Sequence, residues 1–215
     1  MIERTFAVAA LAAMLASHAS ALPLTPAEVA KLCGEAEGPA HCGRLVEAEQ
    51  FKRLPGLAVR DGNTLRLSLF PSGNVTFDDV DTPSGGKSFA LWDYLSEINA
   101  AILWTTQDDD TGFVIVQRAG GGRQTPLPAE PVLAPDRQRI ATADFCAERC
   151  DNRLTVWRVS RDGVTREAAF EPAEKWTDAT VRWKDPQTVL ITYTREGASQ
   201  SATLERRLAE PGWLR

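Results

Sequence analysis

The chain has few of the residues on which most enzymes rely. It contains two histidines, His18 and His41, and only His41 lies beyond residue 21. It has no Gly-x-Ser-x-Gly motif, so a serine hydrolase would lack both its nucleophile turn and its general base. We therefore expect no histidine-based catalysis, and we expect His41 to be a surface residue.

The sequence also lacks excess positive charge and long apolar runs. Its 24 Lys and Arg residues face 29 Asp and Glu residues, for a net charge of −5. A nucleic-acid partner would require clustered positive charge, so we expect none. The longest apolar run, residues 6–16, is well short of the ~20 residues that cross a bilayer. We therefore expect no membrane span in the mature chain.

The N-terminus has the three parts of a signal peptide. Residues 1–5 carry Arg4, residues 6–16 are apolar, and residues 17–21 end in Ala-Ser-Ala. This ending suits signal peptidase, whose pocket admits only short side chains. We expect cleavage after Ala21 and a periplasmic or secreted mature protein.

Four cysteines follow this segment, and an even number in an exported chain indicates disulfides. Three pairings are possible, and the simplest joins Cys33 to Cys42 and Cys146 to Cys150 across short polar loops. The ligand spacing and the single remaining histidine do not favour zinc. Three residues separate Cys146 from Cys150, unlike the two of thioredoxin-like redox sites. We expect no metal site at these cysteines.

Residues 22–56 are expected to form a short helical cap stapled by the first disulfide. Thr25, Pro26 and Glu28 form a capping-box pattern, which predicts a helix to about Cys33. A second helix is expected to begin near Pro39 and to end before residues 55–56.

Residues 57–215 are expected to form a mostly antiparallel all-β domain. Apolar residues alternate with period two, and turn signals recur every 8–12 residues. Asp61-Gly62-Asn63 predicts one hairpin. The expected strands are 57–59, 65–69, 75–77, 89–94, 100–105, 113–117, 140–143, 154–159, 165–170, 179–183, 189–194 and 202–206.

A weaker, longer period resembles the blades of WD40- or TolB-like propellers. Residues 131–143 and 152–158 resemble one blade, with a turn before one strand and Val-Trp in the next. The turn at residues 134–137 reads Ala-Pro-Asp-Arg, without the glycine of the family pattern. About three blades cannot close a ring of ~4–8 blades. The resemblance therefore implies an open propeller-like blade stack, and a β-sandwich is the alternative.

Two short motifs suggest ligands, and each has a simpler interpretation. Residues 86–88 read Gly-Lys-Ser, but a phosphate loop needs glycine where Asp81 stands, so we expect no nucleotide cofactor. The run Asp108, Asp109 and Asp110 offers carboxylates to calcium, but the alternating order of a calcium loop is absent, and acids also suit a hairpin tip. Calcium binding is therefore left open.

A second acidic cluster and the tryptophans complete the candidates. Asp79 and Asp81 should share one strand face while Asp78 points away, and paired carboxylates can hydrolyse glycosides. Of the six tryptophans, Trp176 is expected in a loop, where it could contact a ligand.

The sequence therefore favours a non-enzymatic binding or interaction module of the bacterial cell envelope. Its candidate binding residues are Asp108, Asp109, Asp110 and Trp176, and its partner is expected to be an envelope protein or a glycan. The alternative is a carboxylate-dependent, glycosidase-like hydrolase that uses one acidic cluster. We expect no catalytic residue outside such a cluster and no cofactor.

Overall fold

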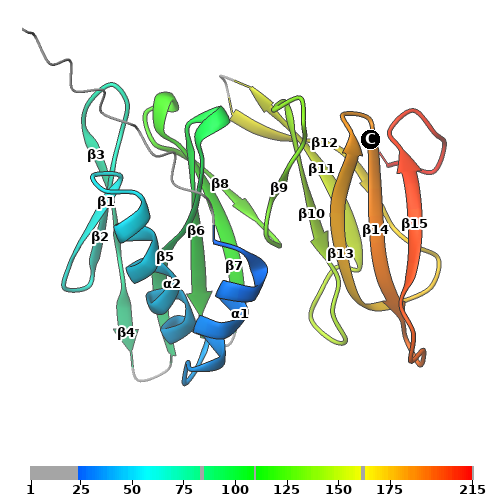
Figure 1. The fold of residues 1–215 in the computed structure, drawn as a ribbon, viewed down its shortest axis with the longest axis horizontal. Coiled ribbons are helices and arrows are strands. Elements are labelled where there is room, and N and C mark those ends of the chain that lie inside the picture. The colour runs from blue at the N-terminus through cyan, green and yellow to red at the C-terminus, as the bar shows by residue number, and fades with distance from the viewer. Residues whose placement is uncertain (1–23, 83–84, 109, 161–162, 215) are drawn as a thin grey trace, which may run out of the picture.

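The computed structural model describes residues 24–82, 85–108, 110–160 and 163–214 (Figure 1). The predicted signal peptide, residues 1–21, lies outside this part of the chain. No helix within the described ranges has the length and apolar character needed to cross a membrane.

Two helices open the fold, as the sequence predicts. Helix α1 (Pro26–Gly34) begins with the capping box, because the Thr25 side chain accepts from the Glu28 N–H and the Glu28 carboxylate accepts from the Thr25 N–H. Helix α2 (Pro39–Arg53) follows. The predicted disulfide between Cys33 and Cys42 joins the two helices, with a Cα–Cα distance of 4.5 Å.

The rest of the chain forms four antiparallel sheets, each built from strands that follow one another in sequence. The first contains β1 (Ala58–Asp61), β2 (Thr64–Ser68) and β3 (Asn74–Asp78). The second contains β4 (Val80–Thr82), β5 (Gly85–Leu95), β6 (Ala100–Gln107), β7 (Asp110–Gln117) and β8 (Arg123–Leu127). Two 3-10 turns, Ser96–Ile98 and Arg118–Gly120, flank β6 and β7.

The third and fourth sheets complete the chain. The third contains β9 (Val132–Leu133), β10 (Arg139–Asp144), β11 (Arg153–Ser160) and β12 (Gly163–Phe170). The fourth contains β13 (Trp176–Asp185), β14 (Thr188–Arg195) and β15 (Ala202–Arg207). The predicted mostly antiparallel β fold with a disulfide-stapled helical cap is therefore confirmed, including the second disulfide, Cys146–Cys150.

The sheets lie in an open row, and apolar residues fill each space between neighbours (Figure 1). Leu103 of β6 packs toward the first sheet, whereas Ile102 packs toward the third sheet. Likewise, Ile140 of β10 packs toward the second sheet, whereas Ala141 packs toward the fourth sheet. Because the inner sheets are covered on both faces, their strands are continuous apolar runs.

The two ends of the row present polar faces. Along β13 the outward residues Asp178, Thr180, Arg182 and Lys184 are all exposed, and they alternate with residues that are more buried. On β3, residues 74, 76 and 78 are exposed in the same alternating manner. Polar outer faces allow terminal units of a stack to face water, so the row needs no further sheet at either end.

Candidate functional site

An open cleft of about 520 Å³ lies where α2 meets the beginning of the second sheet. Its walls come from the start of α2, the β1–β2 turn, the β3–β4 segment, the start of β5 and the end of β6. The lining residues are Ala40, His41, Arg44, Asn63, Asp79, Val80, Asp81, Gly86, Lys87, Ser88, Thr106 and Asp108.

Strand register places five of these residues on one face of the sheet. Asp81 of β4 pairs with Gly86 of β5, and Ser88 pairs with Thr106 of β6. The Asp108 N–H donates to the Gly86 carbonyl at 2.8 Å, which continues the ladder by one pair. Residues two apart on a strand share a face, so both pairs and Asp108 point into the cleft.

Gly86 forms the floor between the two carboxylates. A Cβ at this position would lie 3.1 Å from the Val80 carbonyl oxygen and 3.2 Å from Asp81 Oδ1. Its backbone does not have the positive φ that favours glycine, so the local reason for glycine is space. A side chain at this position would therefore crowd Asp81 and the Val80 carbonyl.

One wall of the cleft adjoins a set of polar contacts between α2 and β5. Arg44, Glu47 and Gln50 recur at three-residue intervals and therefore lie on one face of α2. Strand β4 pairs with β5 only at residues 85–87. The backbone of residues 89–92 consequently depends on other partners along that edge.

Side chains of α2 supply these partners. Arg44 Nη1 donates to the Phe89 carbonyl at 2.9 Å, Glu47 Oε2 accepts from the Leu91 N–H at 2.9 Å, and Gln50 Nε2 donates to the Trp92 carbonyl at 2.6 Å. Glu47 and Gln50 are almost fully buried, and their hydrogen bonds offset the free energy of burying polar groups. The helix thus covers a sheet edge by side-chain hydrogen bonds.

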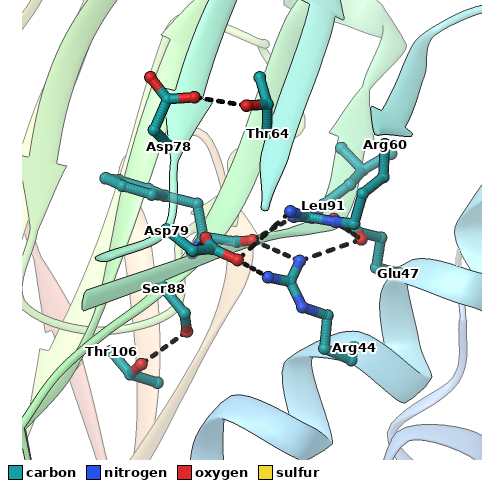
Figure 2. A network of polar contacts seen from close by, with 10 residues as sticks. Arg44, Glu47, Arg60, Thr64, Asp78, Asp79, Ser88, Leu91 and Thr106 are labelled. Atoms are coloured by element: carbon teal, nitrogen blue, oxygen red, sulfur yellow. Dashed lines mark hydrogen bonds and ion pairs between the residues drawn. The ribbon is translucent and has the colours of Figure 1, made fainter. Parts of the chain in front are cut away.

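Two arginines and two carboxylates form the centre of this network, which Figure 2 shows from close by. Arg60 donates to both Glu47 oxygens, with Nη2–Oε2 at 3.0 Å, and to Asp79 Oδ2 at 3.3 Å. Arg44 contacts both acids as well, and Asp79 Oδ1 accepts from the Phe89 N–H at 2.9 Å. Asp79 therefore stands between two guanidinium groups, which favour its ionised form.

The network is electrically balanced. Burial and the nearby Arg60 cation lower the pKa of Arg44 from its ordinary value, whereas Glu47 raises it. Four alternating charges in contact hold one another in fixed positions. We infer that these groups shape the cleft wall and leave recognition to the residues on the sheet face.

The remaining polar groups of the cleft make fewer contacts with other side chains. The Ser88 and Thr106 hydroxyls lie 2.6 Å apart and share one hydrogen bond (Figure 2). Lys87 Nζ lies 4.9 Å from the Phe89 ring centroid. Among the described residues, Asp81 and Asp108 make no ion pair.

The three aspartates of the acidic run, residues 108–110, do not share one site in the structure. Asp108 lines the cleft with a left-handed φ of 55°. Asp109 lies outside the described residues. Asp110 is exposed and contacts Arg149 of the Cys146–Cys150 loop, with Oδ1–Nη1 at 3.2 Å. Across the described ranges, no group of three or more His, Cys, Asp or Glu side chains could hold a metal ion.

The sequence suggested a loop position for Trp176, but this residue begins β13. Its side chain is only 4% exposed, and its ring stacks on Tyr193 with centroids 3.9 Å apart. The flanking Phe145 ring completes this packing. A ligand at the surface would not reach this ring, so we do not include Trp176 in the site.

The second acidic cluster behaves partly as predicted. Asp79 and Asp81 both line the cleft, whereas Asp78 accepts a hydrogen bond from Thr64 at 2.6 Å (Figure 2). Residues 86–88, the Gly-Lys-Ser motif, belong to β5 and form part of the lining. Sequence reasoning missed Arg44 and Glu47, although their spacing along α2 was the available signal.

Burial raises the pKa of Asp144, which lies outside the cleft, and two further carboxyls behave in the same way. Burial raises the pKa of Asp93, which lies at an irregularity of β5, and a hydrogen bond from the Tyr94 N–H partly opposes this effect. Burial also raises the pKa of Glu130, which accepts from the Trp92 indole N–H at 2.8 Å. Neither residue lines the cleft.

Comparison of the chain with protein-family models, with curated proteins and with solved structures found no match, so the geometry of the cleft carries the functional argument.

Proposed function

We propose that this protein is a non-enzymatic binding module of the bacterial cell envelope and that it binds its ligand in the polar cleft. The observation that carries the proposal is the contrast between the wall and the floor of the cleft. Arg44 and Asp79 on the wall are held by ion pairs, whereas Asp81 and Asp108, on the same side of the sheet as the Ser88 hydroxyl, make no ion pair with any described residue. A rigid wall beside available polar groups is a preorganised binding site.

Location in the envelope rests on the predicted signal peptide and on the disulfides. Both disulfides are present, and disulfides persist in oxidising compartments outside the cytosol. We propose that cleavage after Ala21 releases the mature protein into the periplasm or the medium. The partner would then be an envelope protein or a glycan.

The alternative function is a carboxylate-dependent hydrolase. One observation favours it, namely that Asp79 and Asp81 line the same cleft. A glycosidase of this kind needs one carboxyl with a raised pKa as its acid. Asp79 is engaged in ion pairs with Arg44 and Arg60, whereas Asp81 makes no ion pair with a described residue, so Asp81→Asn is the substitution that tests this function.

A hydrolase screen on the purified protein, paired with a pull-down from envelope extract, separates the two functions. The binding proposal predicts capture of a specific envelope component and no turnover. Capture should weaken in Asp81→Asn and persist in Asp110→Asn, whose carboxylate lies outside the cleft. Turnover that Asp81→Asn abolishes would contradict the proposal and establish the hydrolase.

A further inference from the structure

The lining of the cleft offers hydrogen-bond donors and acceptors in similar measure. Asp81, Asp108 and the Asn63 side-chain oxygen can accept, whereas Lys87 and the Asn63 amide can donate. The charges are also nearly balanced, because Arg44 and Lys87 line the cleft together with three carboxylates, one of which, Asp79, is further offset by Arg60. Such a site does not select strongly for a polyanion or a polycation.

The hydroxyl pair adds a donor proton for which the described part of the chain supplies no acceptor. Ser88 and Thr106 possess two hydroxyl protons, but the hydrogen bond between them uses one. Thr106 is only 5% exposed, whereas Ser88 is half-buried and is the member of the pair nearer to bulk water. One atom of a ligand could accept a hydrogen bond from this pair. Another atom of the same ligand could donate to Asp81 or Asp108, which lie nearby on the same face.

A hydroxyl group donates and accepts at the same oxygen atom, so it can use both kinds of group. Gly86 leaves room for them, because a side chain there would crowd Asp81. The cleft volume of about 520 Å³ lies within the range of ~300–1,000 Å³ that is typical of small-molecule sites. These features together describe a site for a short, hydroxyl-rich ligand.

We propose that the cleft binds a short, uncharged oligosaccharide, with sugar hydroxyls donating to Asp81 and Asp108 and accepting from the Ser88–Thr106 pair. This inference rests on the proposed binding function and specifies its ligand. No phenyl, phenol or indole ring is among the described lining residues, so hydrogen bonds rather than ring stacking supply the affinity. We therefore expect weak binding and design the titration for a Kd of about 1 mM.

The test is a titration followed by backbone NMR, with a panel of neutral trisaccharides as probes: maltotriose, cellotriose and N-acetylchitotriose. At about 10 mM, well above the expected Kd of ~1 mM, at least one probe should shift the amide signals of Gly86, Ser88 and Asp108. The shifts should be insensitive to salt, because the probe is uncharged. Pentaarginine, used as the cationic comparison, should bind more weakly than that trisaccharide.

Variants identify the contacts. Asp81→Asn and Asp108→Asn should each weaken trisaccharide binding about fivefold, because a hydrogen bond to a neutral amide replaces one to a carboxylate. Asparagine is chosen at position 108 because it tolerates a left-handed φ. Asp110→Asn is the matched control and should leave the Kd unchanged. Gly86→Ala should also weaken binding by adding a methyl group to the floor.

Two outcomes would overturn the assignment of a sugar ligand, and a third would overturn the non-enzymatic function. If no trisaccharide shifts these signals while pentaarginine does so in a salt-dependent manner, the ligand is a basic partner, and the proposed binding function stands without its sugar. If no probe shifts these signals, the cleft is not a sugar site. If a trisaccharide binds and is cleaved, the ligand class is correct and the non-enzymatic function is wrong.

Discussion

Replacing the buried carboxylate of Glu47 by an amide should destabilise the protein strongly. The Glu47 side chain is 3% exposed, and its two oxygens accept from Arg60, Arg44 and the Leu91 N–H. In Glu47→Gln one of these oxygens becomes an NH2 group, which faces the arginine donors and leaves a cation without its counter-charge. Removing one partner of a buried ion pair costs about 3–5 kcal/mol.

The lower end of that range applies here, because Arg60 and Arg44 retain partial contact with water, with side-chain exposures of 14% and 30%. We expect a loss of about 3 kcal/mol in the free energy of unfolding. For a chain of this size such a loss lowers the Tm by about 6–12 °C. Urea denaturation followed by tryptophan fluorescence measures the first quantity, and a thermal scan measures the second.

The matched control is Glu49→Gln on the same helix. Glu49 pairs with Lys52 and Arg53 at the surface, and such pairs contribute less than about 1 kcal/mol. If the two substitutions cost the same, α2 does not cover the β5 edge through Glu47, and the description of a fixed cleft wall is wrong.

Three further predictions follow from local geometry. Gly43→Ala should destabilise α2 despite the better helix propensity of alanine, because its Cβ would lie 2.7 Å from the ring of Trp104, whereas Gly34→Ala, with nothing within 4 Å, should be neutral in the same urea assay. Burial raises the pKa of Asp93, so the folded state holds this proton more tightly, and stability falls as pH rises through the raised pKa. Asp93→Asn should therefore stabilise the protein at pH 7, and thermal scans at decreasing pH should show the gain vanish below the ordinary aspartate pKa. Arg137→Gly should raise the free energy of unfolding by about 1 kcal/mol, because Arg137 has a left-handed φ of 61°; a loss of stability would mean that its side chain contributes more than the strain costs.

The sequence was a good guide to strands that carry a clear apolar pattern. Each expected strand from residue 57 onward corresponds to a strand of the structure. The three strands that were not expected are β4, β8 and β9. β4 and β9 are three and two residues long, too short for a period to be seen. β8 contains Pro126, which lowers the strand signal but is tolerated because β8 is at the edge of its sheet.

The candidate site was only partly accessible from sequence. Asp81 and Asp108 were recognisable as members of acidic runs, but register alone brings them to either side of Gly86. The spacing of Arg44 and Glu47 indicates a shared helix face, but it does not show what they contact, because their partners lie on β5, more than forty residues away in the chain. The blade-like resemblance to WD40 and TolB proteins stays a prediction, as do export and cleavage after Ala21.

The most direct test of the central claim is site-specific photo-crosslinking in envelope extract. A photoreactive residue is placed at Lys87, on the rim of the cleft, and in a second variant at Thr180, on the polar outer face of β13. If the cleft is the binding site, position 87 should yield a discrete adduct that Asp81→Asn reduces, and position 180 should yield none. An adduct from position 180 alone, or one from position 87 that Asp81→Asn leaves unchanged, would contradict the account.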